Sequence, residues 1–328
     1  MAQRTSLYQD IQENKLFAYT PEVFKMLLRD KTTRKNVIWG TDAYTDLGEG
    51  YGCRDEVTAR KVTGFFGNII KPRSAKTQEE QSDRVKDKAE VFTPSWVCNK
   101  QNNLIDDAWF GTSGNFNTEK EQGWITNTEP VCFAQSGKMW QDYVKENRIE
   151  ITCGEAPYLA SRYDTITGEI IPVKDRIGLL DRKLRIVSEN VQAEPEWYKW
   201  AKRAIQSVYG FDWQGDNILL ARENLLYTFM EHYENKFGVP AIKEYLKEIA
   251  NVLSWNIWQM DGLKFVVPYS CHDEEVTEET LLGKGTKKVS CEGCRTKDNS
   301  KHNGIYCRIY DWSAKRSIEF YSLIKGEK

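Results

Sequence analysis

The chain has 328 residues, 40% of them hydrophobic and 29% charged, and its formal net charge is −2 at pH 7. This length predicts about two domains with ample apolar material for a core. The small net charge excludes a uniformly basic polyanion binder, so any nucleic-acid contact must come from a local patch. The first residues, MAQRTSLYQD, contain no apolar signal core, and no apolar run is long enough to span a membrane. We therefore expect a cytoplasmic protein without a membrane partner, whose eight cysteines are thiols or metal ligands.

Residues 1–85 are predicted to form an N-terminal mixed α/β region. Thr20 and Pro21 mark the start of a helix that ends near Arg29. A short strand and a glycine-rich loop follow in NVIWGTDAYTDLGEGYG. A stretch with five basic residues and no acids comes next, and its members are Arg60, Lys61, Lys71, Arg73 and Lys76. It is either a phosphate-facing stripe that contacts DNA or a solvated loop.

Residues 86–265 alternate helical and strand patterns. We expect helices from Thr93 to about Asp107, over 196–207, over 216–236 and from Pro240 to about Leu253, and strands over 148–152, 208–212 and 255–261. Such alternation predicts an α/β domain with a parallel sheet.

The ends of these predicted strands carry a glycine and two acids. Gly154 offers a tight turn after the first strand, while Asp212 and Asp261 end the second and third strands. A cofactor with ribose and adenine commonly binds where parallel strands end, and an acid there accepts the ribose hydroxyls. Trp213 would stack on the adenine ring. Alternatively, Asp212 is a neighbour of a helix N-cap and Asp261 is a turn residue.

Four segments follow one another along the chain: AEVFTPSWV at 89–97, EITCGEAPYL at 150–159, YGFDWQGDNILLARENLL at 209–226 and WNIWQMDGL at 255–263. Over roughly residues 84–265, this order resembles the amino-type, adenine-specific DNA methyltransferases, the M subunits of restriction–modification systems. The resemblance implies a Rossmann-like fold and S-adenosylmethionine (SAM) as cofactor. It also implies DNA, and possible other restriction–modification subunits, as partners.

The resemblance also assigns cofactor-binding residues. The family loop often reads Asp-Pro-Ala-Cys-Gly-Ser-Gly-x-Phe-Leu, and this chain keeps its acid and its Cys-Gly but has Ala156 in place of the second glycine. That alanine is expected to narrow the space for the methionine moiety. By the same resemblance, Asp212 would hold the ribose and Asp261 the adenine. The predicted cofactor-binding set is Phe92, Thr93, Pro94, Glu150, Cys153, Gly154, Asp212, Trp213 and Asp261.

One family motif is missing. The exocyclic amine of adenine is a poor nucleophile, and an Asn/Asp-Pro-Pro-aromatic tetrapeptide accepts its hydrogens and clamps the flipped base. The nearest text, Val267-Pro268-Tyr269, lacks an acid or amide before the proline, and Asp311-Trp312 is a remoter substitute. The catalytic residues are therefore unassigned or come from a partner chain. The chain is either a SAM-dependent adenine N6-methyltransferase or a catalytically silent, methyltransferase-like zinc protein that binds DNA or a partner.

Residues 266–328 are predicted to form a small cysteine-rich module. Its Cys-Glu-Gly-Cys segment is typical of a knuckle around a metal. Four cysteine or histidine ligands complete a closed, structural zinc site. The low hydrophobicity of this stretch favours a metal staple over a self-sufficient core. Reduced structural cysteines near one loop are the alternative. The predicted ligands are Cys271, Cys291, Cys294 and Cys307, with His302 or His272 as possible replacements for one cysteine.

Overall fold

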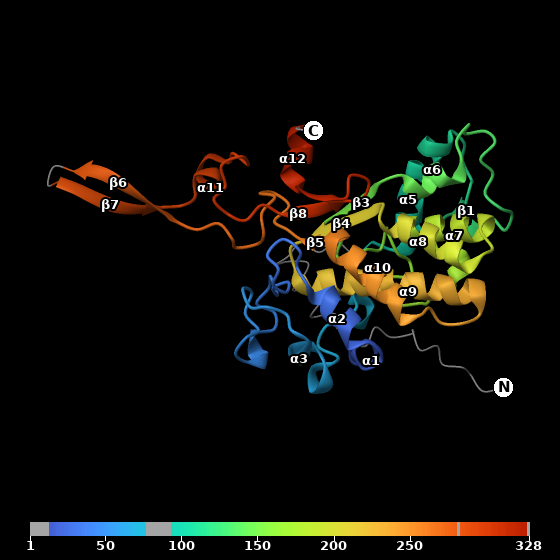
Figure 1. Cartoon of the computed structure of the whole chain (residues 1–328), viewed down its shortest axis with the longest axis horizontal. Coiled ribbons are helices and arrows are strands. Elements are labelled where there is room, and N and C mark those ends of the chain that lie inside the picture. The colour runs from blue at the N-terminus through green and yellow to red at the C-terminus, as the bar shows by residue number, and fades with distance from the viewer. Residues whose placement is uncertain (1–12, 77–92, 281–282, 327–328) are drawn as a thin grey trace.

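The protein is represented by a computed structural model, which describes residues 13–76, 93–280 and 283–326 (Figure 1). The α-helices are α1 (Glu13–Tyr19), α2 (Pro21–Leu28), α3 (Ala59–Val62), α5 (Ser95–Phe110), α6 (Trp140–Lys145), α7 (Leu179–Asn190), α8 (Glu194–Ile205), α9 (Gly215–Phe237), α10 (Lys243–Asn256), α11 (Glu292–Thr296) and α12 (Phe320–Lys325). The strands are β1 (Asn117–Lys120), β2 (Gly123–Thr126), β3 (Arg148–Ile151), β4 (Val208–Asp212), β5 (Ile257–Gln259), β6 (Glu274–Thr280), β7 (Gly283–Val289), β8 (Arg308–Asp311) and β9 (Arg316–Glu319).

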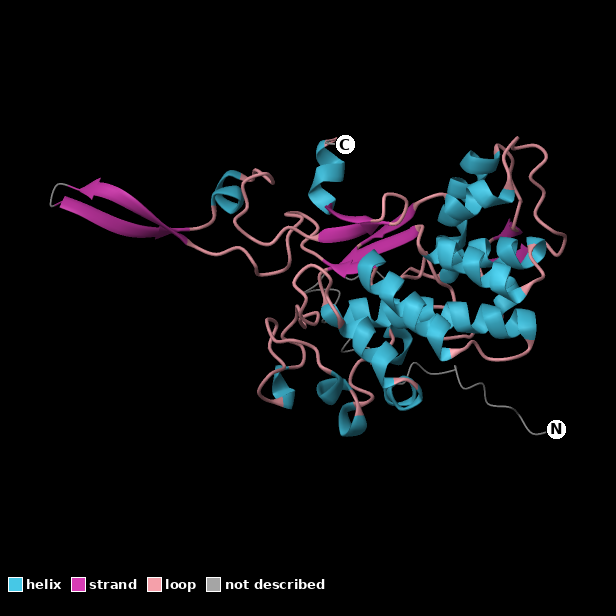
Figure 2. Cartoon of the chain, viewed as in Figure 1, coloured by secondary structure: helices cyan, strands magenta, loops and turns pink. Residues whose placement is uncertain are grey.

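A parallel sheet of β3, β4 and β5 lies near the centre of the molecule (Figure 2). The three strands pair in chain order, with Glu150 opposite Gly210 and Phe211 opposite Trp258. Helices α7 and α8 connect β3 to β4, and α9 and α10 connect β4 to β5. The parallel pairing predicted from the helix–strand alternation is confirmed for these three short strands. Because parallel strands run in one direction, their carboxyl ends meet at one edge of the sheet.

Helix α9 is the centre of the main core. Eighteen of its 23 residues are buried, so neighbours cover it on nearly every side. Arg222 lies fully inside, and its guanidinium donates to the carbonyls of Leu27, Ser254 and Ile257. Those carbonyls belong to α2, α10 and β5. One buried cation therefore ties three elements to α9, since buried carbonyls are stabilised by such bonds.

The N-terminal region packs into the same core as the helices of the middle region. Phe24 and Trp39 belong to one buried cluster together with Leu219 and Phe229. A second, smaller cluster joins the other side of the sheet to the C-terminal strands, and its members are Phe211, Trp258, Met260, Cys307 and Ile309. The C-terminal region therefore has two parts, because β8 packs on the sheet while the preceding residues extend away from it (Figure 1).

Two details differ from the elements predicted by the sequence. NVIWG forms no strand, and Ile38 makes a single antiparallel bridge to Glu56. The backbone of Ile38 instead bonds to the side-chain amide of Gln259 on β5, which donates to its carbonyl and accepts from its amide. This side chain takes the place that a fourth strand would occupy. Helix α10 begins at Lys243 rather than at Pro240, and it extends to Asn256, so β5 has only three residues.

The antiparallel pair β6–β7 projects from the body as a hairpin, with α11 near its base (Figure 1). Glutamates on β6 face lysines on β7, as Glu275 opposite Lys288 illustrates. Within the described residues, no helix has the length and apolarity needed to cross a membrane.

Candidate functional site

A cavity of about 690 Å³ opens where β3 and β4 end. Six residues of the predicted cofactor-binding set line it, namely Thr93, Glu150, Cys153, Gly154, Asp212 and Trp213. They come from three distant parts of the chain, and the parallel pairing of β3 with β4 brings together all of them except Thr93, which lies before α5. The volume falls in the range of small-molecule sites in proteins.

The loop after β3 turns sharply over this cavity. Thr152, Gly154 and Ala156 all have positive φ, at 49°, 52° and 64°. Ala156 lacks the freedom of a glycine here, because non-glycine residues adopt positive φ at a cost. A Cβ added at Gly154 would meet no atom within 4 Å. The space above Gly154 is therefore open to a ligand.

The carboxylate of Asp212 fastens this loop to β4. Its Oδ2 accepts a hydrogen bond from the amide of Gly154 at 3.0 Å, and its Oδ1 accepts from the amide of Gln214 at 2.9 Å and from Asn217 Nδ2 at 3.3 Å. Burial raises the pKa of Asp212 to about 6, although these hydrogen bonds oppose the rise. A carboxylate offers about four lone-pair sites, so Asp212 can still accept from a ligand hydroxyl.

Glu150 organises the same loop from the end of β3. Its side chain accepts hydrogen bonds from the amides of Tyr158 at 3.4 Å and Leu159 at 3.2 Å. Burial raises the pKa of Glu150 to about 8, and the two backbone hydrogen bonds only partly offset this effect. Glu150 is therefore largely protonated at neutral pH and shapes the cavity wall as an uncharged group.

The cavity also has residues that the sequence analysis did not assign to it. Arg73 and Lys76 line it, although the sequence groups both with the basic residues of the stretch from Arg60 to Lys76. Tyr269 lines it as well, with its ring centroid 5.2 Å from that of Trp213 in an edge-on arrangement. Tyr269 follows Pro268, the segment noted as nearest to the missing tetrapeptide. No spacing rule in the sequence connects these residues to β3 and β4.

The other three residues of the predicted cofactor-binding set are Phe92, Pro94 and Asp261. Phe92 lies outside the described residues. Pro94 is the N-cap of α5 and faces a different cavity. Asp261 does not line this cavity but borders a neighbouring one together with Trp213 and Tyr269, and its Oδ1 accepts from the amides of Leu263 at 3.0 Å and Lys264 at 3.2 Å. The adenine contact expected for Asp261 stays a prediction.

The cavity bordered by Pro94 is larger, at about 1,100 Å³, and lies between the β1–β2 hairpin, α7 and α9. Polar side chains that line it already bond to other groups of the protein. Trp124 Nε1 donates to the carbonyl of Asp175, and Arg185 bonds Glu189. Its size alone therefore does not indicate a site, and the smaller cavity has the strand-end chemistry.

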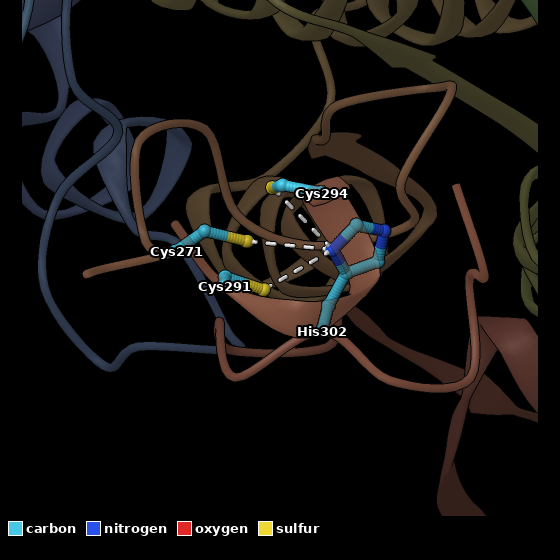
Figure 3. A group of neighbouring side chains, drawn as sticks. All are labelled: Cys271, Cys291, Cys294 and His302. Carbon is cyan, nitrogen blue, oxygen red and sulfur yellow. Dashed lines mark hydrogen bonds between the residues drawn. The ribbon is translucent and has the colours of Figure 1, made fainter. Parts of the chain in front are cut away.

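A cluster of three thiols and an imidazole lies close to the base of the β6–β7 hairpin (Figure 3). The cluster consists of Cys271, Cys291, Cys294 and His302, whose ligand atoms all lie within 4.8 Å of one another. Each sulfur is 3.7 Å from His302 Nδ1. A tetrahedral zinc with Zn–S bonds of about 2.3 Å and a Zn–N bond of about 2.0 Å separates its ligand atoms by roughly 3.5–3.8 Å. These four residues could hold a metal ion of that kind.

Two glycines allow the chain to approach so closely. A Cβ on Gly293 would lie 2.6 Å from both the amide nitrogen and Nδ1 of His302. A Cβ on Gly304 would lie 2.7 Å from Ser270 Oγ and 3.0 Å from the sulfur of Cys271. The other ring nitrogen of His302 lies 3.3 Å from Asn299 Oδ1, which orients the ring with Nδ1 toward the sulfurs.

Cys307, predicted as the fourth ligand, is not part of this cluster. It is fully buried in the second core cluster, and its thiol donates to the carbonyl of Gln259 at 3.4 Å. Burial raises its pKa well above the usual range, which disfavours a metal-binding thiolate. His302, one of the two alternatives considered, takes its place, whereas His272 is exposed and outside the group.

One thiol of the cluster, Cys291, has local support for negative charge, whereas burial and the neighbouring thiols raise the pKa of Cys271 to about 12. Burial alone would raise the pKa of the Cys291 thiol, but hydrogen bonds from backbone amides and from His302 lower it to about 6. The amide of Asn303, for example, donates to the sulfur of Cys291 at 3.3 Å. A thiolate is the form that binds metal, so this environment suits a cation.

A scan against protein-family models, a search of curated proteins and a search of solved structures each found no match to this chain. The geometry of the cavity and of the cluster must therefore support any statement about function.

Proposed function

We propose that the chain binds SAM in the cavity at the carboxyl edge of the β3–β4–β5 sheet and acts in methyl transfer to adenine in DNA. The observation that carries this proposal is the convergence of Glu150, Gly154 and Asp212 on one cavity at the ends of adjacent parallel strands. An acid and a positive-φ glycine at such strand ends are the features that bind an adenosine-type cofactor. The three strands would be one half of a reduced Rossmann-like sheet.

Each part of SAM has a suitable neighbour in this cavity. The ribose diol would donate to Asp212, and Trp213 would border the adenine ring. The carboxylate of the methionine moiety would lie near the cations of Arg73 and Lys76, which line the same cavity. The open space above Gly154 would take the cofactor backbone. When bound, SAM would supply an activated methyl group on a sulfonium.

This chain supplies only some of the groups that would hold the target base. Tyr269 lies at the cavity beside Trp213, so an aromatic ring is in place to contact a flipped base. Asp311, the remoter substitute, accepts from the amides of Ser313 and Ala314 in a turn, and it does not line the cavity. The group that accepts the hydrogens of the adenine amine would therefore come from a partner chain. If no such partner exists, the chain is a silent SAM-binding relative.

The metal is proposed to be zinc in a closed structural site. Three thiolates and one imidazole fill a tetrahedral shell and leave no open position for a substrate. Cys271 follows Tyr269 by two residues, so the metal would also fix the chain that borders the cofactor cavity.

Calorimetry with SAM tests the cofactor proposal. Wild type should release or absorb heat, and Gly154→Val should abolish binding because a branched side chain would fill the open space. Gly238→Val is the matched control. Gly238 also has positive φ and open surroundings, but it lies at the end of α9 away from the cavity. Both variants carry similar backbone strain, so a loss of SAM binding that occurs only in Gly154→Val reports on the cavity.

Absence of any SAM heat with wild type would sink the proposal. Transfer of a tritiated methyl group from SAM to unmethylated DNA then separates the enzyme from a silent binder. Transfer by the chain alone would contradict the need for a partner.

A further inference from the structure

A tight turn at residues 64–67 presents one phenylalanine to solvent. Phe65 is 96% exposed, which is unusual for a ring of this size. Its neighbour Phe66 packs against Tyr51, with ring centroids 5.8 Å apart, and meets the ring of Phe65 edge-on at 5.4 Å. Phe66 therefore anchors the turn, while Phe65 rests against Phe66 and leaves nearly all of its surface to solvent.

The turn is held in this shape by specific contacts. The side-chain amide of Asn14 on α1 accepts from the amide of Gly64 and donates to its carbonyl at 3.0 Å. A Cβ on Gly67 would lie 2.0 Å from Asn14 Nδ2, so only glycine lets the amide approach. Thr63 Oγ1 donates to the carbonyl of Ala59 at 2.7 Å and fixes the preceding residue. Phe65 is therefore exposed on a braced turn rather than on a slack loop.

The chain around this turn is positively charged. Residues 57–76 include five basic residues and no acid. Two of the five are directed inward, because Lys61 donates to the carbonyls of Gly50 and Glu56 and Arg73 is buried. Arg60 remains exposed within the segment, and Lys15, next to Asn14 in the chain, is exposed as well. An aromatic tip with cations nearby and no acid in its own segment complements a polyanion that has planar faces.

We propose that Phe65 stacks on a base of single-stranded or locally opened nucleic acid, while Arg60 and Lys15 contact the adjacent phosphates. This surface deepens the proposed function, because it assigns to the N-terminal region a contact with the nucleic-acid substrate. A single ring suffices to stack on a base or to wedge between base steps. A membrane surface would gain little from one ring on a chain whose net charge is −2, since stable anchoring takes larger apolar area or several signals.

The test is fluorescence anisotropy with a labelled single-stranded DNA oligonucleotide at low salt. Phe65→Ala should weaken binding about tenfold, which corresponds to about 1.4 kcal/mol. Phe65→Trp should retain the affinity, and its indole emission should be quenched on binding. Arg60→Gln and Lys15→Gln should reduce the dependence of affinity on salt. Leu104→Ala is the matched control, because Leu104 is also an exposed apolar side chain, 70% accessible on α5, and its loss should change nothing.

Two outcomes would overturn the proposal. One is an affinity for the oligonucleotide that is absent or equal in wild type and Phe65→Ala. The other is Phe65-dependent binding to vesicles of phosphatidylserine and phosphatidylcholine without Phe65-dependent binding to the oligonucleotide. Calorimetry with SAM on Phe65→Ala keeps the two proposals apart. If Phe65→Ala binds SAM with the heat of wild type and also binds DNA as wild type does, the proposed surface alone is refuted. If wild type gives no heat with SAM, the cofactor site alone is refuted.

Discussion

The cavity at the ends of β3 and β4 and the Cys271–His302 cluster are assembled in different ways. The cavity takes Arg73, Gly154 and Asp212 from separate parts of the chain, and the main core holds them in place. The cluster takes all four ligands from residues 271–302, a segment with few buried apolar side chains. In the first region, packing positions the polar groups. In the second region, packing is sparse, so the metal proposed there would provide the order.

This difference predicts opposite sensitivities. A substitution in the cavity should change ligand affinity and leave the global fold in place, since the core is large. Removal of the metal should unfold one module and leave the core intact. Structural zinc contributes about 10–16 kcal/mol of binding free energy in small modules, far more than a single hydrogen bond.

The largest expected effect is therefore loss of the metal. Purified wild type should contain about one zinc per chain by elemental analysis. Cys291→Ser should remove it, and amide hydrogen exchange should then become fast over residues 271–306 while β3 and β4 stay protected. Cys307→Ser is the matched control, because Cys307 lies outside the cluster and its serine should leave the zinc in place. A metal-free wild type that is well ordered over this segment would contradict the prediction.

The second effect concerns pH and the cavity wall. Burial raises the pKa of Glu150 to about 8, against 4.5 in an exposed chain. Between these two values the folded protein keeps a proton that the unfolded chain has released, so rising pH favours unfolding. The stability contributed by Glu150 is fully present below about pH 4.5 and is lost as the pH approaches 8. Thermal melts from pH 5 to pH 8.5 should show this fall.

Glu150→Gln should flatten that pH dependence, since glutamine does not titrate and keeps one of the two oxygens that accept from the amides of Tyr158 and Leu159. Glu248→Gln provides the comparison. The hydrogen bond from Lys202 holds the pKa of Glu248 below its usual value, so Glu248 does not titrate in this window. An unchanged slope in Glu150→Gln would show that this carboxyl is not buried as described.

A third, smaller effect is expected at Asp212. Asp212→Ala should weaken SAM binding by about 10- to 150-fold, because a charge-assisted hydrogen bond contributes about 1.5–3 kcal/mol. It should also lower the free energy of unfolding by roughly 1–3 kcal/mol, since the amides of Gly154 and Gln214 lose their acceptor. Calorimetry and thermal melts on the same sample separate the two losses. Asp212→Asn, which keeps one oxygen acceptor, should be milder in both. If Asp212→Ala bound SAM as tightly as wild type, Asp212 would not hold the ribose.

Much of the cavity could be predicted from sequence because its pieces obey local rules. The strand and helix periods located β3, β4 and α9 closely, and parallel strands bring their carboxyl ends together. Gly154 and Asp212 followed from that geometry. Asp261 lies beyond the end of β5, in a turn where its side chain accepts from the amide of Leu263, and it lines a neighbouring cavity instead. Arg73 and Tyr269 reach the cavity through tertiary packing, which no local pattern encodes.

The fourth metal ligand shows a different limit. Spacing alone left Cys307, His302 and His272 as candidates, since each lies within reach along a flexible chain. The choice depends on where the chain begins to pack on the sheet. Cys307 directly precedes β8 and belongs to the core cluster with Phe211, so the module ends before it. The Cys-Glu-Gly-Cys segment predicts the knuckle, but the contact of its Gly293 with His302 emerges only from the fold.

The smallest expected effect tests whether the ion, rather than surface charge, orders the module. Lys301 and Glu292 form an ion pair at 2.7 Å beside the cluster, and their side chains are 47% and 44% exposed. Exposed pairs of this kind contribute about 0–1 kcal/mol, because water screens them and the long side chains lose freedom. Lys301→Gln should therefore leave zinc affinity nearly unchanged in a competition titration with a chromophoric chelator. The backbone carbonyl of Lys301 accepts from the amide of Gly293 at 2.9 Å, and glutamine keeps that bond. If Lys301→Gln released the metal as Cys291→Ser is expected to, the module would depend on surface charge, and the contrast with the packed cavity would fail.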